Sequence, residues 1–242
     1  MNESIEELHW KKFYKVGAWA ALFGVLAGVV ESSIQFFPGA AGEVVTAADW
    51  FALIQAHWFI GLRNLGLLNI LFAISGIPFM IALYGAHRKS QPTFALQAMI
   101  VSMIGAGVFL ATNRTFAMLD LSQQYSAATS EAQRAALVAA GQSMLVVGKS
   151  HTPGTFLAFL FTEGAGLLMS IVMLRGGVFS KGNAIAGIVA FSLLLLYDIS
   201  YSFVPSLQTL AMIMVMFAGA ASIIWQVMTA LKLFKLGKVD VT

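Results

Sequence analysis

The stretch GLRNLGLLNILFAISGIPFMIALYG, residues 61–85, decides the fold class of this chain. It contains a single charged side chain, that of Arg63, near its beginning. A helix needs about 20 mostly apolar residues to cross the roughly 30 Å hydrocarbon core of a bilayer. The stretch meets this requirement, and it therefore predicts a transmembrane helix.

Five other segments meet the same requirement: residues 16–37, 93–119, 155–174, 183–204 and 207–231. The chain is 59% hydrophobic and only 10% charged, whereas soluble domains carry roughly 25% charged residues. This composition excludes an ordinary soluble protein. It predicts an all-α fold, a polytopic membrane helix bundle of about six transmembrane helices with short interfacial or extracytoplasmic helices. The lipid bilayer is the expected partner, and the net charge of +3 argues against nucleic acid as a second one.

The beginning of the chain has two interpretations, a signal peptide or a retained first span. Its apolar part is longer than the roughly 7–15 residues of a signal-peptide core, which favours a retained span. The pattern Ser4-Ile5-Glu6-Glu7 is typical of a helical capping box. We expect residues 1–15 to form a short amphipathic cytoplasmic helix, residues 16–236 a single six-span domain, and residues 237–242 a cytoplasmic tail.

The distribution of cations predicts the orientation. With the N-terminus in the cytoplasm, ten of the fourteen Lys and Arg residues fall at the cytoplasmic ends of the spans. These are Lys11, Lys12, Lys15, Arg88, Lys89, Arg175, Lys181, Lys232, Lys235 and Lys238. Cytoplasmic loops of membrane proteins carry an excess of Lys and Arg. We therefore expect a multi-pass protein of the cytoplasmic membrane with both termini in the cytoplasm.

Two of the expected external loops are long enough to form helices. In residues 38–60, Thr46 and Asp49 match a helix cap, and the apolar positions that follow have helical spacing: Trp50, Phe51, Ile54 and Trp58. This pattern predicts an interfacial helix with its aromatic rings at the level of the lipid headgroups. In residues 120–153, Ser130 and Gln133 match a second capping box, and the Ala-rich run after them predicts a helix outside the bilayer.

The layout of the chain resembles a family of uncharacterised bacterial integral membrane proteins, one of the domain-of-unknown-function families. The matching features are spread over most of the sequence. They are the basic turn IALYGAHRK at 81–89, the polar pair Asn113-Arg114, the Ala-rich stretch at 127–140, the segment Lys149-Ser150-His151 and the segment LRGGVFSK at 174–181. The resemblance implies a bacterial multi-span membrane protein, and it implies no activity.

Ionisable side chains inside the spans are the candidate functional residues, because each costs a few kcal/mol in lipid unless it has a partner or a role. The candidates concentrate in the expected outer half. They are Glu31, Arg114, Glu163 and Asp198, with Asn113, Tyr197, Tyr201, Arg63 and Asn69 at the same level.

Two interpretations of this set compete. In the first, Arg114 pairs with Glu31, Glu163 or Asp198 and fixes which helices pack together. In the second, the same residues line a cavity that binds or transports a small polar or amphipathic ligand. An acid left without a cation would tend to hold its proton, which suits a proton-coupled carrier.

The histidines and the search for catalytic motifs add little to the prediction of function. His57 and His151 are weak candidates for a metal or haem site, because nothing in the sequence brings them together. The motifs Gly-x-Ser-x-Gly and His-Glu-x-x-His are absent from the sequence. Three functions remain open: a ligand-binding or transport protein, an accessory or structural subunit of a larger membrane complex or homo-oligomer, and, less favoured, an intramembrane enzyme. The sequence assigns no cofactor.

The orientation can be tested by reporter fusions. Reporters inserted within residues 38–43 and within residues 129–134 should be active on the external side, because both loops carry few cations. A reporter placed after Lys238 should be active in the cytoplasm. An external C-terminus would contradict the six-span prediction.

Overall fold

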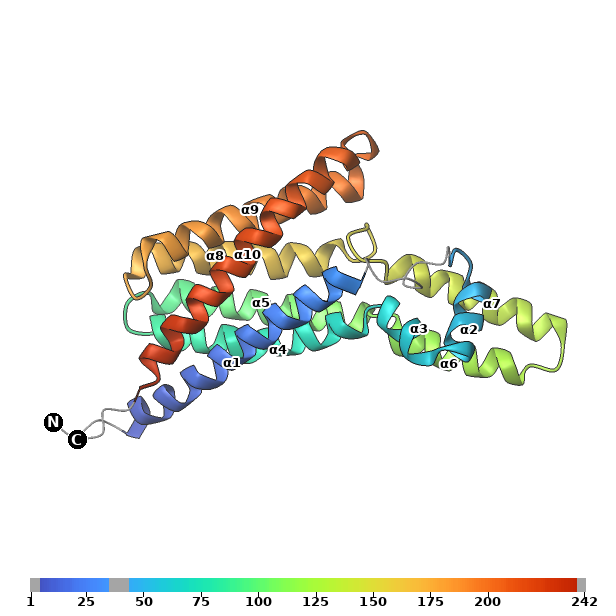
Figure 1. The fold of residues 1–242 in the computed structure, drawn as a ribbon, viewed down its shortest axis with the longest axis horizontal. Helices are drawn as coiled ribbons and strands as arrows, with labels where there is room; N and C mark the ends of the chain where they lie inside the picture. Colours follow the sequence, from blue (N-terminus) through green and yellow to red (C-terminus); the bar gives the residue numbers. More distant parts are fainter. Residues whose placement is uncertain (1–4, 35–43, 239–242) are drawn as a thin grey trace.

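The computed structural model describes residues 5–34 and 44–238, and these residues form helices and connecting loops without a β-strand. Six helices in this part of the chain are long and apolar enough to cross a membrane (Figure 1). They are α1 (Ile5–Ile34), α4 (Leu67–His87), α5 (Pro92–Thr112), α8 (Phe156–Gly176), α9 (Lys181–Phe203) and α10 (Gln208–Leu236). The predicted fold class, an all-α bundle with six spanning-type helices, is confirmed.

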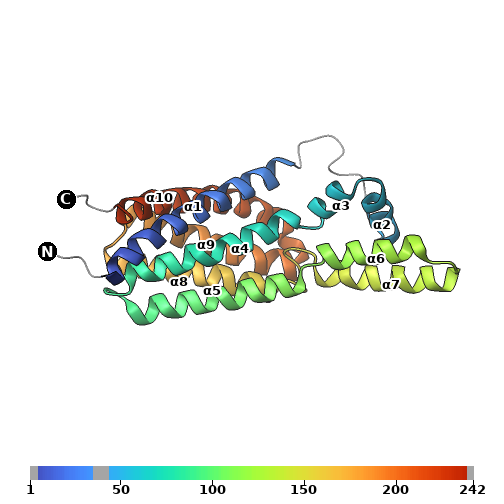
Figure 2. The ribbon, with the colours of Figure 1, turned by 90° about the horizontal axis from the view of Figure 1, so that it is seen from below.

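The six long helices form a ring in the order α1, α4, α5, α8, α9, α10, and α10 closes the ring by packing against α1. The beginning of α1 and the end of α10 lie at the same end of this ring, which we call the terminus end (Figure 1). Beyond the opposite end lie four shorter helices, α2 (Ala47–Ala56), α3 (Trp58–Asn64), α6 (Thr115–Ala127) and α7 (Glu131–Val147) (Figure 2). We call these four helices the cap. A short 3-10 helix, η1 (Pro205–Leu207), connects α9 to α10.

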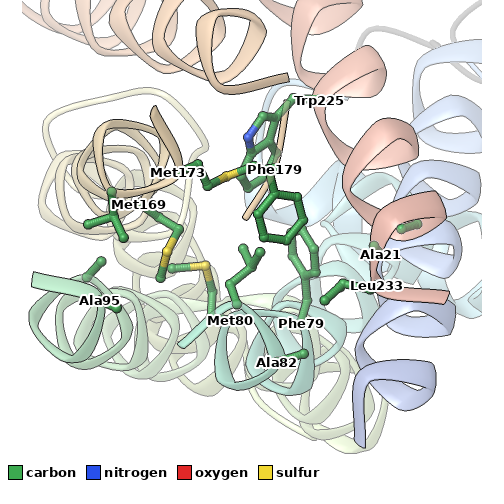
Figure 3. Packing of buried hydrophobic residues seen from close by; sticks show 14 of the residues in the cluster. Ala21, Phe79, Met80, Ala82, Ala95, Met169, Met173, Phe179, Trp225 and Leu233 are labelled. Carbon is green, nitrogen blue, oxygen red and sulfur yellow. The ribbon is translucent and has the colours of Figure 1, made fainter. Parts of the chain in front are cut away.

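The half of the ring nearest the terminus end is packed solid. Buried apolar side chains from all six long helices meet there, among them Met80, Met169 and Leu233 (Figure 3). Trp225 lies at one boundary of this cluster, with its ring 5.4 Å from that of Phe79 and 5.0 Å from that of Phe191. Because lipid tails are as apolar as these side chains, close van der Waals packing stabilises the cluster.

The first helix differs from the prediction. Residues 5–15, expected as a separate amphipathic helix, are the first turns of α1 and continue into the span without a break. The cause is tertiary packing: the Trp10 ring lies against Gly85 of α4, and the Arg88 guanidinium lies over that ring at 4.9 Å. Arg88 also donates hydrogen bonds to Glu7 at 2.7 Å and to the Tyr14 hydroxyl at 3.0 Å. These contacts hold the beginning of α1 against the α4–α5 turn. Residues 1–4, and Phe37 at the end of the first predicted span, lie outside the described residues.

The second and third predicted spans, 61–85 and 93–119, are each interrupted near the cap. The first interruption lies at Leu65 and Gly66, where Gly66 adopts a left-handed conformation with φ of 107° between α3 and α4. Glycine adopts this conformation without the steric cost of a side chain. The second lies at Asn113 and Arg114, between α5 and α6. The fourth, fifth and sixth spans begin and end within a few residues of α8, α9 and α10.

Polar side chains satisfy the backbone groups that these interruptions expose. The Asn113 side-chain oxygen accepts a hydrogen bond from the Thr115 amide at 2.9 Å, which caps the beginning of α6. The Thr115 hydroxyl donates to the Leu65 carbonyl at 3.1 Å and so joins the two interruptions. An unpaired buried backbone group costs about as much as a lost hydrogen bond, so these bonds stabilise both breaks.

The cap confirms both predicted capping boxes, Thr46 with Asp49 at the start of α2 and Ser130 with Gln133 at the start of α7. Hydrogen bonds from the Thr46 hydroxyl and backbone amide hold the pKa of Asp49 below its usual value. The central residues of α2 pack inside the cap, while its position relative to the lipid headgroups stays a prediction. Phe51 and Ile54 are buried against α6 and α7, whereas Trp58 is 62% exposed.

Close contacts between helices occur at some of the glycines in the long helices. Along α5, a side-chain carbon at Gly105 would collide with the Thr162 backbone and with Phe161 of α8, whereas one at Gly107 would meet no atom within 4 Å. Gly105 therefore sets the distance between α5 and α8, since small residues let helix backbones approach closely.

This contrast between two glycines of one helix can be tested. Gly105→Val should destabilise the protein by about 1–3 kcal/mol, because over-packing forces α5 and α8 apart. The matched variant Gly107→Val should leave the thermal unfolding temperature in detergent unchanged. Equal destabilisation by the two substitutions would mean that α5 and α8 do not pack through Gly105.

Candidate functional site

A cavity of about 640 Å³ lies inside the ring of long helices, between the packed cluster and the cap. All six long helices contribute to its lining. Trp225 and Phe79 belong to both the cavity wall and the packed cluster, so the cluster closes the cavity toward the terminus end. The volume falls within the roughly 300–1,000 Å³ that is typical of small-molecule sites.

The chemistry of the wall changes along the cavity. Aromatic rings from five helices make the apolar part, namely Phe72, Phe79, Phe109, Phe159, Phe191 and Trp225. Ionisable side chains gather toward the cap, namely Glu31, Arg114, Lys149, His151 and Glu163. The cavity is therefore amphipathic, with a polar region near the cap.

The structure brings four of the nine candidate residues to the cavity wall: Glu31, Asn69, Arg114 and Glu163. The other five are near it without belonging to its lining. Asp198 lies behind the wall on α9, and the rings of Tyr197 and Tyr201 contact each other there in a tilted arrangement, with ring centres 5.4 Å apart. Asn113 caps α6, and Arg63 lies in α3, where it donates hydrogen bonds to the Asn64 side chain at 3.0 and 2.8 Å.

Arg114 differs from the expected buried ion pair. Its Nη1 atom donates a hydrogen bond to the Leu145 carbonyl of α7 at 2.9 Å, and its buried Nε atom has no acceptor among the described residues. Within the same part of the chain, no carboxylate lies within ion-pair distance of Arg114. The reason is the interruption between α5 and α6, which directs this side chain toward α7. Arg114 therefore joins the ring to the cap.

Glu31, at the same level on α1, has a buried carboxylate oxygen without a donor among the described residues. Arg63 is close enough to interact with it electrostatically, although no direct ion pair is formed within those residues.

Glu163 and Asp198 face each other across the contact between α8 and α9. Their carboxyl groups are within hydrogen-bonding reach, and both side chains are buried, with 6% and 1% exposure. One oxygen of each, Oε2 of Glu163 and Oδ2 of Asp198, has no donor among the described residues. Two carboxylates at this separation repel each other strongly unless a proton lies between them.

His151 completes the cluster. Its Nδ1 atom lies 2.5 Å from Oδ1 of Asp198, and its ring stacks on Phe159 at 4.2 Å and meets the edge of Tyr197 at 4.9 Å. The backbone of His151 has a φ of 55°, a conformation that is costly for a residue with a side chain. The surrounding contacts hold the imidazole in place against this cost.

Sequence reasoning considered His151 only as a weak metal or haem ligand. The segment Lys149-Ser150-His151 was noticed for its family resemblance, but no spacing rule joins it to Asp198. His57, the other weak candidate, lies between α2 and α3 in the cap. Among the described residues, no group of three His, Asp or Glu side chains is arranged to hold a metal ion.

A ring of six apolar helices around an amphipathic cavity defines a polytopic membrane helix bundle. The chain belongs to the family described as "Domain of unknown function (DUF4386)", whose profile matches residues 18–229. This match runs from within α1 to within α10 and includes the four other long helices and the cap, and it confirms the predicted resemblance. Comparison with curated proteins and with solved structures found no match.

The partner of Glu163 can be tested by a double-mutant cycle. If Asp198 is the partner, Glu163→Gln should preserve the thermal unfolding temperature in detergent, because the new amide donates a hydrogen bond to Asp198. Glu163→Gln and Arg114→Gln should then have additive effects. A buried Glu163–Arg114 ion pair would instead make the first substitution cost about 3–5 kcal/mol, with partial recovery in the double variant.

Proposed function

We propose that this protein binds an amphipathic small molecule in the cavity beneath the cap. The observation that carries the proposal is the division of the wall into an aromatic region and a polar region with unpaired groups. Ligand sites are usually lined by apolar and aromatic side chains, with a small number of polar groups that fix the orientation of the ligand. The polar headgroup would lie near Arg114 and Glu31, and the apolar part would extend toward Trp225.

Buried polar atoms without partners support this proposal. Within the described residues these include Oε2 of Glu31, Nε of Arg114, Oε2 of Glu163 and Nε1 of Trp225, and all four side chains line the cavity. A buried donor or acceptor without a partner costs about 1–3 kcal/mol. A ligand or bound water that supplies partners to these atoms would recover that cost.

The packing of α9 and α10 suggests how the ligand reaches the cavity. Toward the cap, this helical hairpin diverges from α1 and α8 (Figure 1). Side chains on the cap-end turns of α10 are strongly exposed, with Met216 at 73% and Phe217 at 68%. At the same level of α1, Val29 and Val30 are 43% and 40% exposed. We infer that an amphipathic molecule reaches the cavity sideways from the bilayer, between α1 and α10.

The alternative function, an accessory subunit of a larger complex, requires the buried charges to fix the packing of the helices. Glu31, Arg114 and Glu163 form no ion pair with one another, which favours a ligand site over a structural network. Ten Lys and Arg residues lie toward the terminus end, at the beginning of α1, the α4–α5 and α8–α9 turns and the end of α10. The excess of cations at cytoplasmic ends supports a location of the cavity on the external side of the cytoplasmic membrane.

The proposal can be tested by filling the cavity. Gly76 lines it and has open space around its Cα atom, so Gly76→Leu should occupy the cavity without disturbing the helices. Binding of dodecyl phosphate, dodecyltrimethylammonium and dodecyl maltoside to the protein in nanodiscs would be measured by native mass spectrometry. We expect saturable binding of at least one of the three, weakened at least about tenfold by Gly76→Leu.

The matched control is Gly219→Leu. Gly219 also has open space around it but does not belong to the cavity lining. This variant should bind the same amphiphile as the unmodified protein does. No saturable binding of any amphiphile, or equal loss in the two variants, would contradict a ligand site in the cavity.

A further inference from the structure

We infer that His151, Asp198 and Glu163 form a proton-exchange chain between the solution at the cap end and the wall of the cavity. The role of the proton rests on the proposed function, because the proton changes the charge of the wall that the ligand contacts. Its geometry is independent of any ligand. It consists of a carboxyl–carboxyl contact and a carboxyl–imidazole contact that share Asp198.

The first contact holds one proton. Glu163 and Asp198 are within hydrogen-bonding reach, yet Oε2 and Oδ2 have no donor among the described residues. A single proton between the two groups supplies the missing donor and removes the repulsion between two buried negative charges. The pair then carries one negative charge in total. A hydrogen-bond donor on the other side of Asp198 stabilises this charge.

The second contact, between His151 and Asp198, supplies this hydrogen-bond donor. Oδ1 of Asp198 accepts a hydrogen bond from Nδ1 of His151 at 2.5 Å, so Nδ1 carries the hydrogen in this arrangement. The imidazole is fixed between the rings of Phe159 and Tyr197. Its side chain is 29% exposed, in contrast with 1% for Asp198. His151 is therefore the member of the proton-exchange chain that solvent reaches most easily.

The route passes behind the cavity wall. Phe159 lies one turn before Glu163 on α8 and stacks on His151, so its ring separates these two residues along the wall itself. Asp198 contacts both of them from α9 and does not line the cavity. The link between His151 and Glu163 therefore passes behind the wall through Asp198, while both of these residues line the cavity.

The proton transfer conserves both protons and charge. One proton binds to Nε2 of His151 from solution, and the proton on Nδ1 moves to Oδ1 of Asp198. The proton shared between Asp198 and Glu163 then passes wholly to Glu163, and Glu163 releases it to the cavity or to a ligand group. Rotation of the Asp198 carboxyl and tautomer exchange of the His151 hydrogen from Nε2 to Nδ1 restore the starting state. One proton enters, one leaves, and no other bond changes.

Few other charged or titratable groups face the proton-exchange chain. Tyr197 and Tyr201 lie beside Asp198 on α9, and Lys149 lies two residues before His151 in the α7–α8 loop. Across the cavity the charged groups are Arg114 from the α5–α6 junction and Glu31 from α1. Among the described residues that line the cavity from α4, α5 and α10, none is ionisable.

The shared proton can be detected with dicyclohexylcarbodiimide, an apolar reagent that modifies protonated carboxyl groups. The full chain in nanodiscs should be modified once, at Glu163 or Asp198, as identified by peptide mass spectrometry. Modification should decrease with increasing pH. Glu163→Gln and Asp198→Asn should each react at least about tenfold more slowly at the remaining carboxyl, because the new amide replaces the shared proton as donor.

This outcome separates a shared proton from two independent buried acids. If the two acids are independent, each single variant keeps the reactivity of the other carboxyl group. That result would overturn the proposed proton-exchange chain. If the protein without substitutions does not react with the carbodiimide at any pH, the proposal is overturned as well. Gel filtration and thermal unfolding of each variant show that the fold is retained.

The role of His151 needs a readout that a structural role would not change. His151→Asn should shift the pH midpoint of carbodiimide modification by about one unit, because the hydrogen bond from the imidazole Nδ1 to Asp198 is changed. The matched variant His57→Asn, in the cap, should leave the midpoint unchanged. An unchanged midpoint in His151→Asn would remove His151 from the chain. None of these measurements uses a ligand, so their failure is distinguishable from failure of the proposed function.

Discussion

The backbone of a chain in hydrocarbon must satisfy its own hydrogen bonds, and the architecture of this protein depends on that constraint. Within the apolar segments, the long helices meet it without interruption. Where the chain leaves the helical path, at Gly66 and at Asn113–Arg114, polar side chains replace the lost backbone partners. Both interruptions lie at the cap end, where α3 and α6 turn away to form the cap. The polar residues at these two interruptions stabilise the junction between the ring and the cap.

This junction and the packed cluster determine where the cavity lies. At the terminus end, small residues and large apolar side chains fill the centre of the ring, and the α1–α4 contact is fixed by Trp10 and Arg88. At the cap end, the α9–α10 hairpin diverges and the centre of the ring is left open (Figure 1). Trp225 lies at the boundary between the two regions. The floor of the cavity is therefore rigid, and its polar groups lie where helices separate.

The buried polar groups fall into two kinds with different physical roles. Asn113, Thr115 and Arg114 donate to or accept from backbone groups and stabilise the junction. Asn183 and Thr229 hydrogen bond to each other at 2.9 Å between α9 and α10, a local pair that fixes packing. Glu163 and Asp198 are different, because each presents an acceptor to the other and neither supplies a donor without a proton. The proposed proton exchange is built on this arrangement, because two buried carboxyl groups in contact need a proton between them.

The sequence by itself determined the helical class, the number of spanning-type helices, both capping boxes and the level at which Glu31, Arg114 and Glu163 lie. Apolar length and local hydrogen-bonding patterns decide these features, and both are visible in consecutive residues. Only the tertiary structure decided that Arg114 hydrogen bonds to α7, that Phe51 is buried in the cap, and that Glu163 meets Asp198. The pairing of Asp198 with His151, 47 positions away, was equally invisible. Which faces of two helices meet depends on how all six pack in the ring, and hydrophobic periodicity is nearly uniform around helices that are apolar on every side.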